Sequence, residues 1–240
     1  MSWAEERKPA SLDQIVGQPD AVAVLTAFLE NPNRFNRCIA LVGGTGTGKT
    51  TAAEVLARGF NCVDTVQDGL SYITAATFNK EAAEKLFCGS DLHTKPLFSR
   101  SKGDWWRVVI LEEMEWLHPD VQRILKVQLQ PHVLSPRAIV IVTSNNVDKL
   151  DRALMGRFAR VDFDSGQKFA DACQPYIRYV WKQETKLPMP DLSKFGWQDK
   201  QFSLRDALDS LERYAVRLEY NAKPREQRSR EAEAVAMERF

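Results

Sequence analysis

The chain has 240 residues, of which 44% are hydrophobic and 27% are charged. This composition is typical of a folded chain with a packed core and excludes a disordered one. Lys and Arg number 33 against 32 Asp and Glu, so the net charge of +1 excludes nucleic-acid binding through bulk positive charge. No apolar run reaches the roughly 20 residues of a membrane span, and the cysteines form no disulfide or zinc pattern. We therefore expect a cytoplasmic protein.

The first two thirds of the chain alternate short apolar runs with amphipathic segments. Strands that alternate with helices imply βαβ crossovers and a parallel sheet. The expected strands cover 38–42, 71–74, 108–111, 138–143 and 160–163, and the expected helices cover 18–30, 50–58, 78–87 and 119–130. This pattern predicts an α/β domain over residues 1–165, with a long loop at 89–106.

From about residue 166 the strand pattern ends and helical spacing replaces it. Apolar residues recur at helical spacing over 169–180, and we expect Pro175 to kink or split that helix. Ser203, followed by Asp206, has the pattern of a capping box at the start of a second helix with a continuous apolar stripe. The prediction is an all-helical domain over 166–218 and a charged tail, helical or frayed, over 219–240.

A glycine-rich segment lies between the first expected strand and the helix after it. It matches the phosphate-binding pattern G-x-x-x-x-G-K-[ST] in the strand–loop–helix context that the pattern requires. Backbone N–H groups of such a loop surround phosphate oxygens, while the lysine reaches the terminal phosphates and the hydroxyl ligates Mg²⁺. A glycine-rich turn that resembles the motif by chance is the alternative. The predicted nucleotide-binding residues are Gly43, Gly44, Thr45, Gly46, Thr47, Gly48, Lys49, Thr50 and Thr51.

Polar residues follow two of the buried strands at the edge where ligands of parallel sheets bind. Glu112 and Glu113 come directly after 108–111; Glu112 is expected to support Mg²⁺ together with Thr50, and Glu113 to polarise the attacking water. Asn145 follows 138–143, where its amide can bond both water and phosphate. The alternatives are acidic residues that favour a helix start and an asparagine in an ordinary turn.

Together these motifs resemble the AAA+ ATPases, and within them the clamp-loader subunits of DNA replication, of the replication factor C or bacterial tau-gamma type. The resemblance covers about residues 5–217. It implies a parallel-sheet AAA+ core with a C-terminal helical lid, and ATP with Mg²⁺ bound between them. The segment 7–18 is similar to the clamp-loader opening that surrounds the adenine, which implies that Pro9 and Val16 contact the nucleotide. Asn145 matches the sensor 1 position.

Two arginines also take their expected roles from the resemblance. Residues 149–158 are similar to the segment that ends in the clamp-loader arginine finger, which implies that Arg157 reaches the nucleotide of a neighbouring subunit. Residues 203–212 are similar to the lid helix that carries the sensor 2 arginine, here Arg205. A surface arginine paired with Asp151 or Asp162 is the alternative for Arg157.

The resemblance implies that the partners are other AAA+ subunits in a ring or spiral, a sliding clamp and primer–template DNA. We expect no contact with a membrane, and a bacterial or phage origin.

The chain departs from the pattern where Glu112 replaces the usual Asp and where residues 219–240 are too few for a collar domain. These departures keep two alternatives open. One is another AAA+ remodeller, such as a helicase loader, a transposition regulator or a phage-defence ATPase; the other is a nonhydrolysing ATP-dependent scaffold.

Overall fold

The computed structural model describes residues 2–62, 66–97, 105–195, 197 and 201–222. The β-strands are β1 (Cys38–Gly43), β2 (Leu70–Thr74), β3 (Arg107–Glu112), β4 (Ala138–Ser144) and β5 (Ala159–Phe163). The α-helices are α1 (Trp3–Glu6), α2 (Pro19–Glu30), α3 (Lys49–Gly59), α4 (Lys80–Cys88), α5 (Pro119–Gln128), α6 (Arg152–Met155), α7 (Gln167–Glu184) and α8 (Leu204–Ala222). Short 3₁₀ helices are η1 (Leu12–Gln14), η2 (Pro32–Arg34), η3 (Val66–Asp68), η4 (Ala75–Thr77), η5 (Asp91–His93), η6 (Met114–Trp116), η7 (Val147–Lys149) and η8 (Leu192–Phe195).

The five strands form one parallel sheet in the order β2-β3-β4-β1-β5. Its three central strands are buried along nearly their whole length, which is why they read as unbroken apolar runs in the sequence. Because all strands are parallel, their carboxyl ends meet at one edge. The α/β fold with a parallel sheet is confirmed, and the structure adds the short helices α1 and α6.

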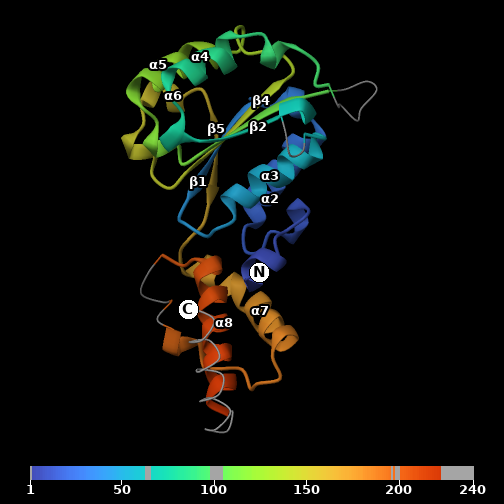
Figure 1. Cartoon of the computed structure of the whole chain (residues 1–240), viewed down its shortest axis with the longest axis vertical. Helices are drawn as coiled ribbons and strands as arrows, with labels where there is room; N and C mark the ends of the chain where they lie inside the picture. Colours follow the sequence, from blue (N-terminus) through green and yellow to red (C-terminus); the bar gives the residue numbers. More distant parts are fainter. Residues whose placement is uncertain (1, 63–65, 98–104, 196, 198–200, 223–240) are drawn as a thin grey trace, which may run out of the picture.

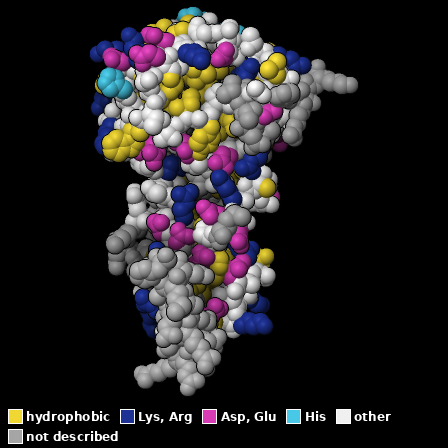
Figure 2. Space-filling model, in the orientation of Figure 1, with side chains coloured by type: hydrophobic (Ala, Val, Ile, Leu, Met, Phe, Trp, Pro, Cys, Tyr) yellow, Lys and Arg dark blue, Asp and Glu magenta, His cyan; other side chains and the backbone are white. Residues whose placement is uncertain are grey.

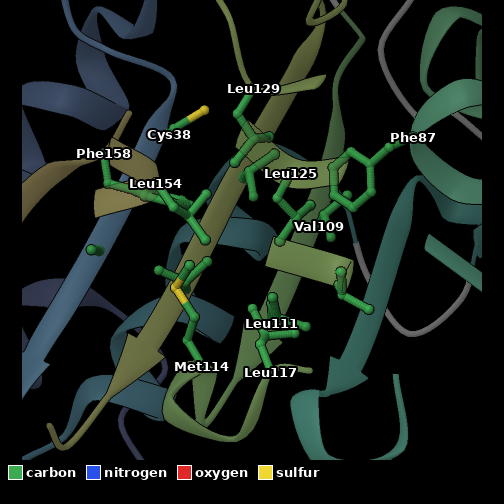
Figure 3. Close-up of a cluster of buried hydrophobic side chains, with 14 of the residues drawn as sticks. Cys38, Phe87, Val109, Leu111, Met114, Leu117, Leu125, Leu129, Leu154 and Phe158 are labelled. Carbon is green, nitrogen blue, oxygen red and sulfur yellow. The ribbon is translucent and has the colours of Figure 1, made fainter. Parts of the chain in front are cut away.

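Each face of the sheet carries its own hydrophobic core, because successive side chains of a strand point to opposite faces. Val109 and Leu111 of β3 pack under α4, α5 and α6, where Figure 3 shows them among Leu125, Leu129 and Met114. Val108 and Ile110, which alternate with them along β3, face the other side, against α2 and α3. Each fully buried side chain of this size contributes roughly 1.5–3 kcal/mol to folding, so both cores stabilise the sheet.

Helices α7 and α8 lie below the sheet and form a separate cluster (Figure 1). Pro175 was expected to kink or split this helix; it does not split it, since α7 is a single helix with Pro175 inside it. A proline removes one backbone hydrogen bond from a helix interior. Buried side chains on both sides of Pro175, including Phe169 and Trp181, pack against α8 and offset that loss.

The N-terminal helix α1 packs onto the helical part. Trp3 meets Trp181 edge-to-face with ring centroids 6.2 Å apart, and the Trp3 backbone N–H donates to Glu212 of α8 at 3.2 Å. The N-terminal segment therefore bridges the sheet and the helices. The division at residue 165 stays a prediction, and residues 223–240 of the predicted tail lie outside the described residues.

The surface in the orientation of Figure 1 carries charges of both signs. Figure 2 shows Lys, Arg, Asp and Glu side chains interspersed around the narrow region between the sheet and the helical part. This mixture agrees with the net charge of +1. Within the described ranges, no helix is long and apolar enough to cross a membrane.

Candidate nucleotide-binding site

The loop between β1 and α3 has the backbone of a phosphate-binding turn. Gly46 and Gly48 both have positive φ angles, of 70° and 99°. A Cβ atom at Gly46 would lie 1.9 Å from Oγ of Ser203, so glycine is required there for space as well as for φ. The Leu204 N–H donates to the Gly46 carbonyl at 3.2 Å. The first turn of α8 therefore rests directly on this loop.

Lys49 begins α3 and turns its ammonium group back into the loop. Its Nζ donates to the carbonyls of Gly43 at 2.7 Å and Gly44 at 2.5 Å, and to Asn145 Oδ1 at 2.9 Å. Burial lowers the pKa of Lys49 from 10.5 to about 8; the charge of Glu115 opposes this shift and that of Arg205 adds to it. A poorly solvated cation in a glycine-rich loop favours an anionic ligand.

Glu112 lies at the end of β3 and is held by two hydroxyl groups. The Thr50 hydroxyl donates to Glu112 Oε1 at 2.6 Å. Tyr72 projects from the neighbouring strand β2, and its phenol is hydrogen-bonded to Glu112. The pKa of this phenol is raised, mainly by burial and secondly by the hydrogen bond to Glu112. The Glu112 carboxylate is therefore oriented towards the start of α3. Sequence reasoning did not identify Tyr72, whose strand position carries no motif.

Glu113 adopts a left-handed backbone conformation, with φ 55° and ψ 48°. Few residues other than glycine do so, and such geometry is concentrated at functional sites. The conformation turns the chain out of the sheet, leaves the Glu113 side chain exposed, and lets its N–H donate to Thr143 Oγ1 at 3.3 Å. Its role in activating water stays a prediction.

Asn145, at the end of β4, is fixed by a residue that sequence reasoning missed. Its backbone N–H and side-chain Nδ2 both donate to Glu115 Oε1, at 3.1 and 3.0 Å. Since Oδ1 of Asn145 accepts from Lys49, a continuous chain runs from Lys49 through Asn145 to Glu115. The only sequence signal for Glu115 is its place as the third acid among residues 112–115, at and just after the end of β3.

A cavity of about 410 Å³ adjoins the loop between the sheet and the helical part. Of the predicted nucleotide-contacting residues, its wall includes Gly46, Thr47, Gly48, Thr51, Pro9, Val16 and Arg205. The predicted Thr45 is exposed at the tip of the loop, and the Thr47 hydroxyl donates to the Gly44 carbonyl at 2.8 Å. The structure thus brings together the phosphate loop, the N-terminal segment and α8.

The described residues contain no group of three or more His, Cys, Asp or Glu side chains that would form a metal cage. Mg²⁺ does not require one, because it is usually bound by one or two carboxylates together with substrate phosphates and waters. The adjacent oxygens of Thr50 and Glu112 fit that donor set.

Arg157 lies apart from this cavity. It precedes the amino end of β5, whereas the phosphate loop follows the carboxyl end of β1. The Arg157 carbonyl accepts from Asn36 Nδ2 at 2.6 Å, and Asn36 precedes β1. The six residues of β1, at about 3.3 Å each, span about 20 Å. The side chain of Arg157 therefore does not reach the phosphate loop of its own chain. Its Nε is buried and, within the described part of the chain, has no hydrogen-bond partner.

Comparison with known proteins agrees with this geometry. The family profile of the ATPase family associated with various cellular activities (AAA) matches residues 39–164. The chain belongs to this family. The match runs from β1 to the residue after β5 and so includes the phosphate loop, Glu112, Glu113 and Asn145. Family membership indicates an ATPase.

Curated relatives of this AAA chain are named replication factor C subunits. The replication factor C small subunit of Thermofilum pendens is 28% identical over 211 residues, which cover 88% of this chain and 61% of the relative. The small subunit of Methanoculleus marisnigri is 28% identical over 163 residues, covering 67% of this chain and 48% of the relative. The resemblance to clamp-loader subunits is confirmed, and the chain spans less than two thirds of these relatives' length.

Solved structures share the fold at lower identity. A katanin self-assembly structure is 20% identical and covers 93% of this chain and 76% of its own, with a TM-score of 0.63. The Holliday junction branch migration motor RuvB of Thermotoga maritima is 18% identical and covers 73% of this chain and 54% of its own, with a TM-score of 0.53. These likenesses confirm the AAA fold.

Proposed function

We propose that this chain binds ATP with Mg²⁺ in the cavity between the sheet and α8, hydrolyses it, and uses the cycle as a molecular switch in DNA replication. The observation that carries the proposal is the hydrogen bond between Lys49 and Asn145. It joins the phosphate loop to the end of a strand 96 residues later in the chain, which is the arrangement a phosphoryl-transfer site needs.

Each residue has a distinct task in this proposal. Lys49 and the loop amides bind the phosphates, and Asn145 orients the terminal phosphate and the attacking water. Thr50 and Glu112 would hold Mg²⁺, which would supply charge neutralisation at the phosphates when bound. Glu113 takes the proton from water as its oxygen attacks.

Arg205 and Arg157 connect hydrolysis to movement. Arg205 lies in the first turn of α8, next to Leu204, whose N–H donates to the Gly46 carbonyl, so a change in phosphate contact would alter the lid angle. Arg157 lies too far from its own loop to act there, which supports a role at the nucleotide of a neighbouring AAA+ subunit, as the similarity to replication factor C also suggests. A sliding clamp on primer–template DNA is the client we propose.

Replacement of Glu113 by Gln tests hydrolysis. We expect Glu113→Gln to bind ATP as the unmodified chain does and to release phosphate at least about a hundredfold more slowly, since general-base catalysis is worth that much. Glu84→Gln, an exposed acid of α4, is the matched control. Equal rates in Glu113→Gln and the unmodified chain would refute the assignment. ATP binding without any phosphate release by the unmodified chain would favour the nonhydrolysing scaffold.

The client is tested with the Glu113→Gln protein held with ATP. Capture from lysate followed by mass spectrometry should recover a sliding clamp and other AAA+ subunits. Recovery of a transposase or a helicase instead would move the chain to another class of AAA+ remodeller, with the nucleotide chemistry unchanged.

A further inference from the structure

Lys49 gives all of its hydrogen-bond donors to groups of the protein. An ammonium group has three N–H donors, and Nζ of Lys49 donates to the carbonyls of Gly43 and Gly44 and to Asn145 Oδ1. To bind a phosphate oxygen, Lys49 must therefore give up one of these partners. The bond to Asn145 is the longest of the three, at 2.9 Å, and is lost at the lowest cost.

Glu115 holds Asn145 from the other side. Its Oε1 accepts from the Asn145 backbone N–H at 3.1 Å and from Nδ2 at 3.0 Å, and its Oε2 accepts from the same backbone N–H at 3.3 Å. One carboxylate thus binds both the main chain and the side chain of Asn145, which fixes the side chain relative to the end of β4. Because Asn145 is exposed, its orientation depends on these hydrogen bonds rather than on packing.

These contacts also determine which way round the amide of Asn145 lies. Oδ1 faces the ammonium of Lys49, and Nδ2 faces the carboxylate of Glu115. A flipped amide would place an acceptor against a carboxylate and a donor against an ammonium, and both contacts are repulsive. Nδ2 has two N–H donors, so the bond from one of them to Glu115 fixes the direction of the second.

The turn that carries Glu115 is anchored in the core on both sides. Met114 precedes Glu115 and Leu117 follows it two residues later; both are buried in the core beneath α4, α5 and α6 (Figure 3). The Leu117 N–H donates to the Met114 carbonyl at 3.0 Å and closes the 3₁₀ turn. Buried neighbours therefore present the Glu115 carboxylate to the end of β4.

We propose that Glu115 is a positioning residue for hydrolysis, which holds the amide of Asn145 in its working orientation when Lys49 turns to the phosphates. Lys49 exchanges Asn145 Oδ1 for a phosphate oxygen, and the bonds to Glu115 then keep the amide from rotating. Asn145 Oδ1 accepts from the attacking water, and the second N–H of Nδ2 donates to the terminal phosphate. Glu115 acts through Asn145 alone. The inference rests on the proposed function and adds the residue that orients Asn145.

The test measures kcat for phosphate release and, by titration calorimetry, the affinity for ADP. Glu115→Ala should lower kcat about tenfold to hundredfold, because a displaced reacting group costs that much. ADP affinity should hardly change, since ADP lacks the phosphate that Asn145 contacts. Both are measured at about pH 6.5, well below the pKa of about 8 of Lys49, so that the lost charge does not deprotonate it.

Two further variants separate orientation from charge. Glu115→Gln keeps an acceptor oxygen of the same shape, so it should recover much of the rate that Glu115→Ala loses, although a neutral acceptor forms weaker bonds than a carboxylate. Asp148→Ala removes an exposed carboxylate three residues after Asn145 and should behave as the unmodified chain. If Glu115→Ala does not fold by circular dichroism, Glu115→Met, which has a similar length without an oxygen acceptor, replaces it.

A double-mutant cycle decides whether Glu115 acts through Asn145. Glu115→Ala should have no further effect in a chain that carries Asn145→Ala. Equal effects in both backgrounds, or an unchanged kcat in Glu115→Ala when Asn145→Ala is slow, would overturn the inference and leave the proposed function standing. If Asn145→Ala keeps the full rate, or the unmodified chain releases no phosphate, the proposed function fails and this inference fails with it.

Discussion

Raising the pH above 8 should weaken nucleotide binding, because the Lys49 ammonium then loses its proton in the free protein. Lys49 is only 7% exposed, and burial lowers its pKa from 10.5 to about 8. Bound phosphates hold the proton on Nζ, since an adjacent negative charge favours the charged form. Below pH 8 the free protein already carries that proton, and above pH 8 it must take one up to bind.

The expected magnitude follows from this difference in protonation. Affinity should be constant between about pH 7 and the pKa, then fall about tenfold, or about 1.4 kcal/mol, for each further pH unit. Titration calorimetry with ADP in magnesium-free buffers measures it, and buffers of different ionisation enthalpy report the proton uptake directly. The terminal phosphate, with a pKa of about 6, stays ionised throughout.

Two variants should move the pH at which nucleotide affinity begins to fall, in opposite directions. Glu115→Gln removes a charge that raises the pKa of Lys49, so weakening should begin at lower pH; Arg205→Ala removes a charge that lowers it, so weakening should begin at higher pH. Lys49→Arg should give no fall, because a guanidinium keeps its charge. An unmodified chain whose affinity is flat to pH 9.5, or variants that shift together, would refute the reasoning.

Two further substitutions test the neighbouring-subunit contact and the metal site. Arg157→Ala should leave ATP binding by a single chain unchanged and lower hydrolysis by the assembly about a thousandfold; mixing it with Glu113→Gln should restore part of the rate, and no recovery would argue against action across subunits. Tyr72→Phe removes the hydroxyl that orients Glu112, so the Mg²⁺ concentration for half-maximal activity should rise about tenfold with magnesium-free ADP affinity unchanged. Tyr179→Phe, an exposed tyrosine of α7, is its control, and an equal Mg²⁺ requirement in both variants would contradict the role of Tyr72.

The sequence by itself determined the order and type of the elements in the α/β part. Strands buried on both faces must be apolar throughout, and amphipathic helices must cover them, so both kinds of element appear as local sequence patterns. The predicted ends of these strands and helices differ from those in the structure by at most two residues. The phosphate loop was equally predictable, because its glycines and Lys49 act through consecutive backbone atoms. Glu112 and Asn145 could be expected beside this loop because parallel strands end at one edge, and both form hydrogen bonds with it; their roles stay predictions.

Only the tertiary structure decided which distant side chains meet. Glu115 reaches Asn145 and Tyr72 reaches Glu112 through the packing of separate elements, and no spacing along the chain encodes these contacts. The single helix through Pro175 has the same origin, since burial against α8 outweighs the local cost of the proline. Local sequence patterns reflect the burial and the backbone conformation of each segment, whereas the contacts in a site depend on how the core packs distant segments together.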